Sequence, residues 1–208
     1  MAGHKDTKTF SRISNHKQRN PYGKSFYEAD PVHVASALLG SFLCRVHPEQ
    51  GLLVGRIVET EAYRGEEDLA RHASKGKTPR TEVMYGEPGQ AYVYLIYGMY
   101  HMLNVVVWPQ GDPAAVLIRA LEPVAGVEGS TDGPGKLSRA FEIDSTFNGR
   151  DLTQPPLFIT PGQQPSRSDI VTQARVGIDY AGEWARRPWH FSIRGNGFVS
   201  KVRRTVKG

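Results

Sequence analysis

Cysteine and long apolar runs are scarce in this 208-residue sequence, and both absences exclude classes of protein. Cys44 is the only cysteine, so no internal disulfide, iron–sulfur cluster or multi-cysteine zinc site can form. The apolar runs are far shorter than the roughly 20 residues of a membrane-spanning helix. Residues 1–6 also lack the charged and then apolar layout of a secretory signal. We expect no membrane partner and an intracellular, reducing location.

Several motifs of known chemistry are missing as well. There is no HExxH, no zinc-deaminase signature and no glycine-rich dinucleotide fingerprint, so we expect neither a metal nor a cofactor. Gly135-Lys136 resembles the end of a phosphate-binding loop, but Ser130 and Leu137 stand where that motif needs Gly and Ser/Thr. The segment is therefore either a simple entry to a helix or a turn that offers backbone N–H groups and Lys136 to a phosphate.

The basic charge of the chain lies mostly at its ends. The sequence has 26 Lys and Arg against 21 Asp and Glu, a net charge of +5. Residues 1–24 contain six basic residues and one acid, residues 192–208 contain five and none, and the rest is net acidic. Basic ends on an acidic body are compatible with nucleic-acid binding or simply with solvated tails. We expect a flexible basic arm over 1–24, one folded domain over 25–202 and a basic tail over 203–208.

Local patterns predict both helices and strands, without a regular alternation of the two. The composition, 39% apolar and 23% charged, is that of a globular protein. Residues 64–90 and 153–168 are expected to be irregular. Helices are expected from Pro31 to Gly40, within 133–141 and over 168–176; strands over 42–46, 52–63 and 114–121; and hairpins within 91–107, around Tyr97-Gly98, and within 189–202. The predicted fold class is α+β.

Two glutamates on one strand form the most informative pattern. Alternation along residues 57–63 places Glu59, Glu61 and Tyr63 on one face. A carboxylate beside an aromatic ring can activate water next to a flat ligand. The strand taken alone is equally typical of solvated surface glutamates, and we regard that as its default interpretation. A sugar-directed glycoside hydrolase is a further alternative, but Glu59 and Glu61 would lie about 7 Å apart on one wall, whereas that chemistry needs carboxylates on opposite sides of a bond.

The predicted hairpin over 91–107 is rich in tyrosine. Tyr92 and Tyr94 share a face, which is common for half-buried sheet residues. The tip, Tyr97-Gly98-Met99-Tyr100, would expose large hydrophobic side chains of the kind that insert between base pairs. The preceding loop, 71–80, has four basic residues and no acid, which suits either phosphate contacts or a solvated loop. Together these features indicate base extrusion with chemistry at a glycosidic bond, or a non-catalytic nucleic-acid-binding module.

The longer motifs resemble a known family. These motifs are GRIVETEAY at 55–63, YVYLIYGMY at 92–100, LIRALEP at 117–123, GPGKL at 133–137, ARVG at 174–177 and AGEWA at 181–185. In this order they resemble the alkyladenine (3-methyladenine) DNA glycosylase family over about residues 26–202. Only residues 124–132 separate LIRALEP from GPGKL, so the chain looks like the compact bacterial form. Any DNA contact that a longer insertion makes in vertebrate relatives would be absent.

The resemblance implies a single domain with a mixed, curved antiparallel sheet, surrounding helices and a protruding hairpin that inserts into DNA. The implied activity is removal of alkylated or deaminated purines from double-stranded DNA by a cofactor-free, monofunctional and monomeric enzyme. The expected substrates are 3-methyladenine and 7-methylguanine, with hypoxanthine and ethenoadenine as further candidates.

The resemblance also implies a role for individual residues. By position, Glu61 matches the general base and Arg119 an arginine near the catalytic water. Tyr63, His72 and Tyr94 match the walls of the base pocket, and Asn104 the residue that excludes the exocyclic amine of guanine. Tyr97 matches the wedge that fills the gap in the base stack. Beside it, Met99, Arg80 and Lys136 are expected to contact DNA.

Overall fold

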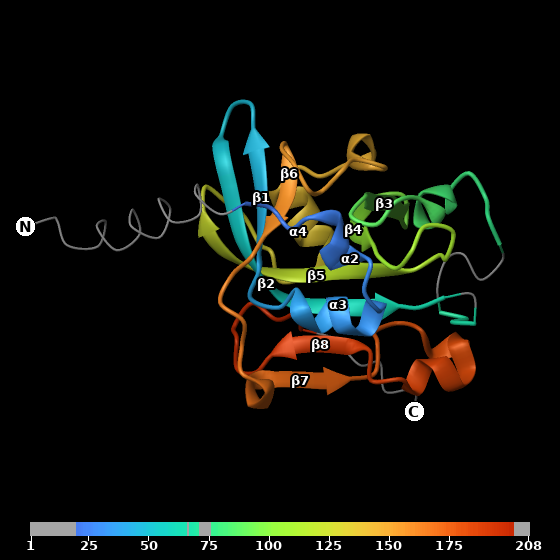
Figure 1. The fold of residues 1–208 in the computed structure, drawn as a ribbon. Coiled ribbons are helices and arrows are strands. Elements are labelled where there is room, and N and C mark those ends of the chain that lie inside the picture. The colour runs from blue at the N-terminus through green and yellow to red at the C-terminus, as the bar shows by residue number, and fades with distance from the viewer. Residues whose placement is uncertain (1–19, 66, 71–75, 202–208) are drawn as a thin grey trace, which may run out of the picture.

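A computed structural model describes residues 20–65, 67–70 and 76–201 of the chain (Figure 1). It contains an eight-stranded antiparallel sheet in which six strands follow the order β3-β4-β5-β2-β1-β6. The remaining two, β7 and β8, pair with each other, and β8 also pairs with β2. The strands are β1 Phe42–His47, β2 Gly51–Tyr63, β3 Ala91–Ile96, β4 Tyr100–Val106, β5 Ala115–Ala125, β6 Leu157–Thr160, β7 Ile170–Gln173 and β8 His190–Ile193.

Short helices join and cover the strands. The α-helices are α2 Lys24–Tyr27, α3 Pro31–Ala37 and α4 Pro134–Ala140, and the 3-10 helices are η2 Glu82–Tyr85, η3 Ser145–Phe147, η4 Arg167–Asp169 and η5 Asp179–Arg186. Helix α3 begins as predicted at Pro31, where the Asp30 side chain accepts a hydrogen bond from the Val32 N–H at 2.9 Å. It packs against β2 (Figure 1). The single domain is thus an α+β fold with a curled antiparallel sheet.

Strand β2 is the centre of the fold because it pairs with β1, β5 and β8. Its pairing with β5 is irregular at Val54/Gly55 and on both sides of Glu59. Such bulges bend a strand and increase its twist, which lets one strand serve different partners at its two ends. Gly55 allows close packing here, because a Cβ atom would lie 3.0 Å from side-chain atoms of Leu121 and Phe141 and these would have to move.

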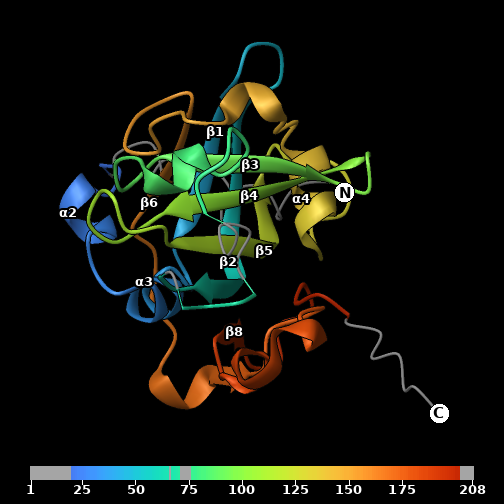
Figure 2. The same cartoon turned by 90° about the vertical axis from the view of Figure 1, so that its right-hand side faces the viewer.

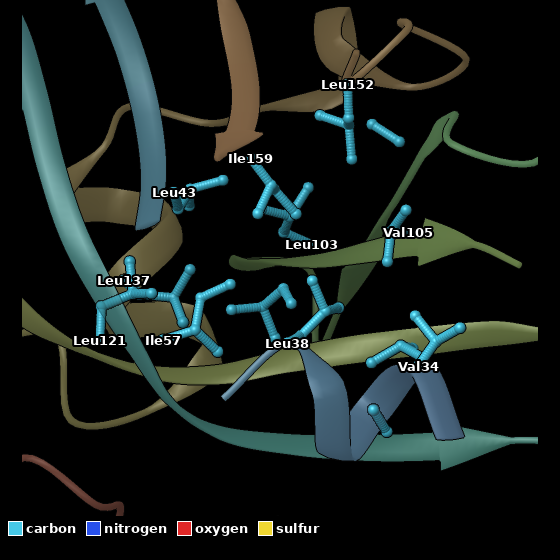
Figure 3. Close-up of a cluster of buried hydrophobic side chains, with 14 of the residues drawn as sticks. Val34, Leu38, Leu43, Ile57, Leu103, Val105, Leu121, Leu137, Leu152 and Ile159 are labelled. Atoms are coloured by element: carbon cyan, nitrogen blue, oxygen red, sulfur yellow. The ribbon is translucent and has the colours of Figure 1, made fainter. Parts of the chain in front are cut away.

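The hydrophobic core fills the space between the curled sheet and the helices (Figure 3). Val34 and Leu38 from the α3 region belong to the same buried cluster as Ile57 of β2 and Leu103 of β4, and all four are fully buried. Burial of each such side chain stabilises the fold by about 1.5–3 kcal/mol. The core therefore holds β2 and β4 rigidly, and the candidate site lies on these strands.

Residues 91–107 adopt the strand pairing that the sequence predicts. Strands β3 and β4 pair from Ala91↔Val105 to Ile96↔Tyr100, with Tyr97-Gly98-Met99 as the connection. Figure 2 shows β3, β4 and β5 side by side, with this connection at the right-hand edge of the molecule. Tyr97 has a φ of 53°, an uncommon backbone conformation for a residue other than glycine.

Three expectations for the second half of the chain are wrong. Residues 157–160 of the expected loop form strand β6, which pairs with the edge of β1 and is followed by Pro161, a residue that edge strands tolerate. The helix expected over 168–176 is replaced by η4 and strand β7, because β-branched Ile170, Val171 and Thr172 pair with β8. The hairpin expected within 189–202 does not form, because β8 takes its partners from β2 and β7.

The structure describes only residues 20–24 of the expected N-terminal arm. Within them, Tyr22 stacks on Phe26 with ring centroids 3.8 Å apart, and its N–H donates to the Ile159 carbonyl at 2.9 Å. Residues 1–19 and 202–208 lie outside the described residues, so the expectation of basic tails stays a prediction. Among the described ranges, no helix combines the length and apolar character needed to cross a bilayer.

Candidate active site

A pocket opens beside the central strands, in a region that the core holds rigid. Its volume is about 720 Å³, counting the space open to solvent. Its wall is built from β2, β3, β4, β5, the 3-10 helix η2 and the segment 176–180. Tyr63, Tyr94, Asn104 and Arg119 all line it, so the fold brings four of the predicted site residues together.

Glu61 lies directly behind this wall and is completely buried. Its carboxylate accepts hydrogen bonds from the Tyr63 hydroxyl at 2.9 Å and the Val176 N–H at 2.7 Å. The Nη1 of Arg119 lies 3.3 Å from Oε2 of the same carboxylate. All three donor residues line the pocket, so the carboxylate sits where they meet.

Glu59 occupies a second buried position behind Arg119. Its carboxylate accepts from Nε of Arg119 at 2.8 Å, the Ser200 N–H at 2.6 Å and the Ser200 hydroxyl at 2.7 Å. Nε2 of His190 lies 2.9 Å from it. The interpretation of Glu59 and Glu61 as solvated surface glutamates is therefore wrong, because β2 is central in the sheet and the neighbouring segments supply their partners.

These contacts shift the pKa values of Glu59 and Arg119. Burial by itself would raise the pKa of Glu59, but hydrogen bonds from His190 and Ser200 and the Arg119 charge outweigh it and lower the pKa to about 2. Burial would likewise lower the pKa of Arg119, but the charges of Glu61 and Glu59 outweigh it and raise the pKa. Glu59 and Arg119 are therefore both charged at neutral pH.

Aromatic rings form the pocket wall next to this network. Burial, together with the nearby Glu61 charge, raises the pKa of Tyr63 well above its usual value, so its hydroxyl stays a donor. As predicted, Tyr92 and Tyr94 share a face, with ring centroids 5.2 Å apart. The Arg80 guanidinium lies 5.5 Å from the centre of the Tyr94 ring and donates to the Leu95 carbonyl at 2.9 Å. Arg80 is thus anchored beside the pocket on the β3–β4 hairpin.

Asn104 projects from β4 into the same pocket and is nearly buried. Its side-chain NH₂ group donates to the Tyr92 carbonyl at 3.1 Å and the Met102 carbonyl at 3.3 Å. Both bonds hold the amide against the strand backbone, so its position in the pocket is well determined.

The hairpin connection presents large exposed side chains next to the pocket. Tyr97 is 84% exposed and Met99 63% exposed, although both are hydrophobic enough to be core residues. By contrast, Ile96 at the end of β3 already contributes to the pocket wall. The connection therefore follows a strand whose end lines the pocket, while Met99 itself borders a separate surface hollow.

One predicted site residue, Lys136, does not join this constellation, and another, His72, lies outside the described residues. Lys136, in the first turn of α4, forms an ion pair with Asp132 at 3.0 Å and borders a different surface hollow. Pro134, at the start of the same helix, lines the pocket and therefore connects the two regions.

Sequence reasoning missed the contribution of the segment 176–180. Val176 holds Glu61 through its N–H, and Tyr180 lines the pocket while its hydroxyl donates to the Ala70 carbonyl at 3.3 Å. The segment is held by Arg175, which pairs with the buried Asp68 and lies over the Tyr63 ring at 4.8 Å. The ARVG motif is the signal that marks this segment in the sequence. Its contact with Glu61 could not be predicted, because the motif lies more than 100 positions from Glu61 along the chain.

The donor chemistry of the described region does not favour a metal. No group of three or more His, Cys, Asp or Glu side chains is placed to hold an ion within residues 20–65, 67–70 and 76–201. The buried carboxylates instead pair with arginine, histidine and hydroxyl donors.

This fold and site define a single-domain α+β protein with an aromatic pocket backed by buried carboxylates. The methylpurine-DNA glycosylase family model matches residues 25–197, and the chain belongs to this family. Family membership makes it a DNA-repair glycosylase, a hydrolase of N-glycosyl bonds that acts on DNA containing alkylated bases.

Three similar bacterial proteins are each named "Putative 3-methyladenine DNA glycosylase". One from Anaeromyxobacter dehalogenans (strain 2CP-C) is 52% identical over 180 residues, covering 86% of each chain. One from Legionella pneumophila (strain Paris) is 49% identical over 179 residues, which is 86% of this chain and 97% of the relative. One from Myxococcus xanthus (strain DK1622) is 51% identical over 181 residues, which is 86% of this chain and 92% of the relative.

Proposed function

We propose that this glycosylase flips alkylated or deaminated purines out of duplex DNA and hydrolyses the N-glycosidic bond with a water activated by Glu61. The substrates are 3-methyladenine and 7-methylguanine, with hypoxanthine and ethenoadenine as further candidates. The observation that carries the proposal is the position of the buried Glu61 carboxylate behind Tyr63, Arg119 and Val176, which all line the aromatic pocket.

The pocket suits a flat and positively charged base. Tyr63 and Tyr94 supply electron-rich rings, and a cation over such a ring is stabilised by about 0.5–2 kcal/mol. A 3-methylated adenine or 7-methylated guanine carries this positive charge in its ring. The same charge makes the base a good leaving group, so the protein has mainly to bind the base and activate water.

In the proposed reaction, Glu61 accepts a proton from the attacking water. For a methylated base, the water oxygen bonds to C1′ of the sugar, the C1′–N bond breaks, and its electron pair neutralises the cationic ring of the departing base. Arg119 lies next to Glu61 and stabilises the carboxylate and the developing charge around the water. No lysine contributes to the described pocket wall, so we propose hydrolysis without strand cleavage.

Base flipping is assigned to the hairpin connection. Tyr97 and Met99 are exposed and would fill the space left in the base stack. Arg80 is anchored beside the pocket, where it can reach a phosphate, and Lys136 on α4 offers a second cation. One chain carries all these groups, so we propose that a monomer is active.

Glu61→Gln provides the test of the proposed function. The amide keeps the shape of the side chain but cannot accept a proton from water. Binding to a duplex with a single 7-methylguanine should stay nearly intact, while release of the free base slows at least about 100-fold. Binding is measured by fluorescence anisotropy and base release by chromatography under single-turnover conditions.

Glu122→Gln is the matched control, because Glu122 lies on β5 and pairs with Arg56 outside the pocket. It should release the base at the rate of the parent. Near-normal release by Glu61→Gln would assign the base to another residue. A parent protein that binds the duplex but releases no base would instead be a non-catalytic nucleic-acid-binding module.

A further inference from the structure

Arg119 is shared unequally by two buried carboxylates. Its Nε lies 2.8 Å from Glu59, a hydrogen-bond distance, while its Nη1 lies 3.3 Å from Glu61. A guanidinium normally prefers a parallel, two-bond pair with a single carboxylate. Such a pair does not form with Glu61, because Nε is bonded to Glu59 and Nη2 is directed at the Ser200 hydroxyl, which leaves only Nη1 facing Glu61.

Glu59 is itself held in place from three sides. Ser200 contributes a backbone N–H and a hydroxyl, His190 contributes Nε2, and the Nη2 of Arg119 also reaches the Ser200 hydroxyl at 3.4 Å. His190 lies on β8 and Ser200 close to the end of the described chain. The position of Arg119 is therefore determined by a group of residues that lie outside the pocket wall.

We infer that Glu59 is a positioning residue that limits Arg119 to a single contact with Glu61, in place of a two-bond ion pair, and so leaves Glu61 able to accept a proton. This inference rests on the proposed function of Glu61. The contacts of Glu61 support it, since its two short hydrogen bonds, at 2.7 and 2.9 Å, come from the neutral donors of Val176 and Tyr63. Without Glu59, the single guanidinium would be free to turn towards the remaining carboxylate.

A double-mutant cycle between Glu59→Gln and Arg119→Gln tests this inference. In the full-length protein, Glu59→Gln should slow single-turnover release of 7-methylguanine at least about tenfold, with less than a twofold change in lesion-duplex affinity. In the Arg119→Gln background the same substitution should cause no further loss, because residues that act through one group are not additive. An equal loss in both backgrounds would overturn the inference.

Two further variants separate positioning from stability. Thr60→Val removes a buried hydrogen bond to the Ala35 carbonyl from the residue between the two glutamates, and should lower the melting temperature without slowing base release. Ser200→Ala removes one neutral bond to Glu59 and leaves every charge in place, so it remains informative if Glu59→Gln does not fold.

Ser200→Ala should slow release several-fold, again only when Arg119 is present. An unchanged rate for Ser200→Ala, or a slower rate for Thr60→Val, would contradict the inference. A parent protein without base release would instead refute the proposed function itself, so the two failures are distinguishable.

Discussion

At the scale of single residues, the site combines permanent charge with fixed neutral donors. Glu59 and Arg119 are buried and charged, while Tyr63 and Asn104 present donors held by short contacts. Burial makes each of these polar groups costly to leave unpaired, by about 1–3 kcal/mol. Substitutions that leave one of these groups without its partner should therefore lower stability as well as alter rate or selectivity.

Asn104→Ser should admit guanine derivatives more readily. The asparagine amide is fixed against the Tyr92 and Met102 carbonyls, and a shorter side chain leaves room for the exocyclic amine of guanine. The ratio of 7-methylguanine to 3-methyladenine released from alkylated duplex DNA should rise by roughly an order of magnitude.

Asn148→Ser controls for general loosening of the hairpin, because Asn148 accepts a hydrogen bond from the Val93 N–H outside the pocket. It should leave the ratio of released bases unchanged. If Asn104→Ser releases the two bases in the ratio of the parent, Asn104 is not the selective residue.

At the scale of elements, the buried strand β2 and the exposed β3–β4 connection differ in their exposure to solvent. Strand β2 is buried along most of its length and paired on both sides, which suits a rigid support for the carboxylates. The β3–β4 connection is exposed and bears Tyr97 and Met99. The rigid element thus carries the proposed chemistry, and the exposed one is available for DNA.

Tyr97→Ser should weaken lesion-duplex binding and slow excision with almost no change in melting temperature, because the side chain is exposed. Flipping a base costs a few kcal/mol, part of which an inserted ring offsets. The defect should shrink when the lesion lies opposite a mismatched base, since that base is extruded more easily. A fluorescent base analogue at the lesion reports flipping directly.

Val46→Ser is a suitable comparison, since Val46 is an exposed hydrophobic residue of β1 that is neither in the pocket wall nor on the hairpin. Its flipping signal should equal that of the parent. Full flipping by Tyr97→Ser, or unfolding several degrees earlier, would assign Tyr97 to the core instead.

At the scale of the whole molecule, the lowered pKa of Glu59 links stability to pH. The carboxylate has a pKa of about 2 in the folded state against an ordinary value of 4.5. Because the folded-state value is depressed, the stabilisation is fully present above pH 4.5 and is lost as the pH falls towards 2. The shift corresponds to roughly 3 kcal/mol of unfolding free energy at neutral pH.

Denaturant unfolding of the parent and of Glu59→Gln from pH 7 to pH 2.5 tests this linkage. The parent should be more stable at neutral pH, and the difference should shrink steadily below pH 4.5 as Glu59 is protonated in the parent. A difference that stays constant over this range would mean that the contacts of Glu59 do not depend on its charge.

Local sequence patterns correctly predicted many of the strands and helices. The two strands at 42–46 and 52–63, the paired strands around Tyr97-Gly98 and the short helix after Gly133 agree with the structure. Strands β6 and β7 were not foreseen, because their pairing with β1 and β8 depends on partners far along the chain. Edge strands of four residues carry too short a periodic signal to be recognised.

The sequence by itself determined which residues share a strand face, including Glu59, Glu61 and Tyr63, because side-chain alternation is a local property of extended backbone. Side-chain alternation could not tell the two glutamates apart, and only the family resemblance singled out Glu61. The tertiary structure decided the partners of each carboxylate, by bringing Ser200 and His190 to Glu59 and Val176 to Glu61, and by placing Arg119 between them. The physical reason is that burial and charge pairing depend on which distant segments pack together, and no local pattern encodes that choice.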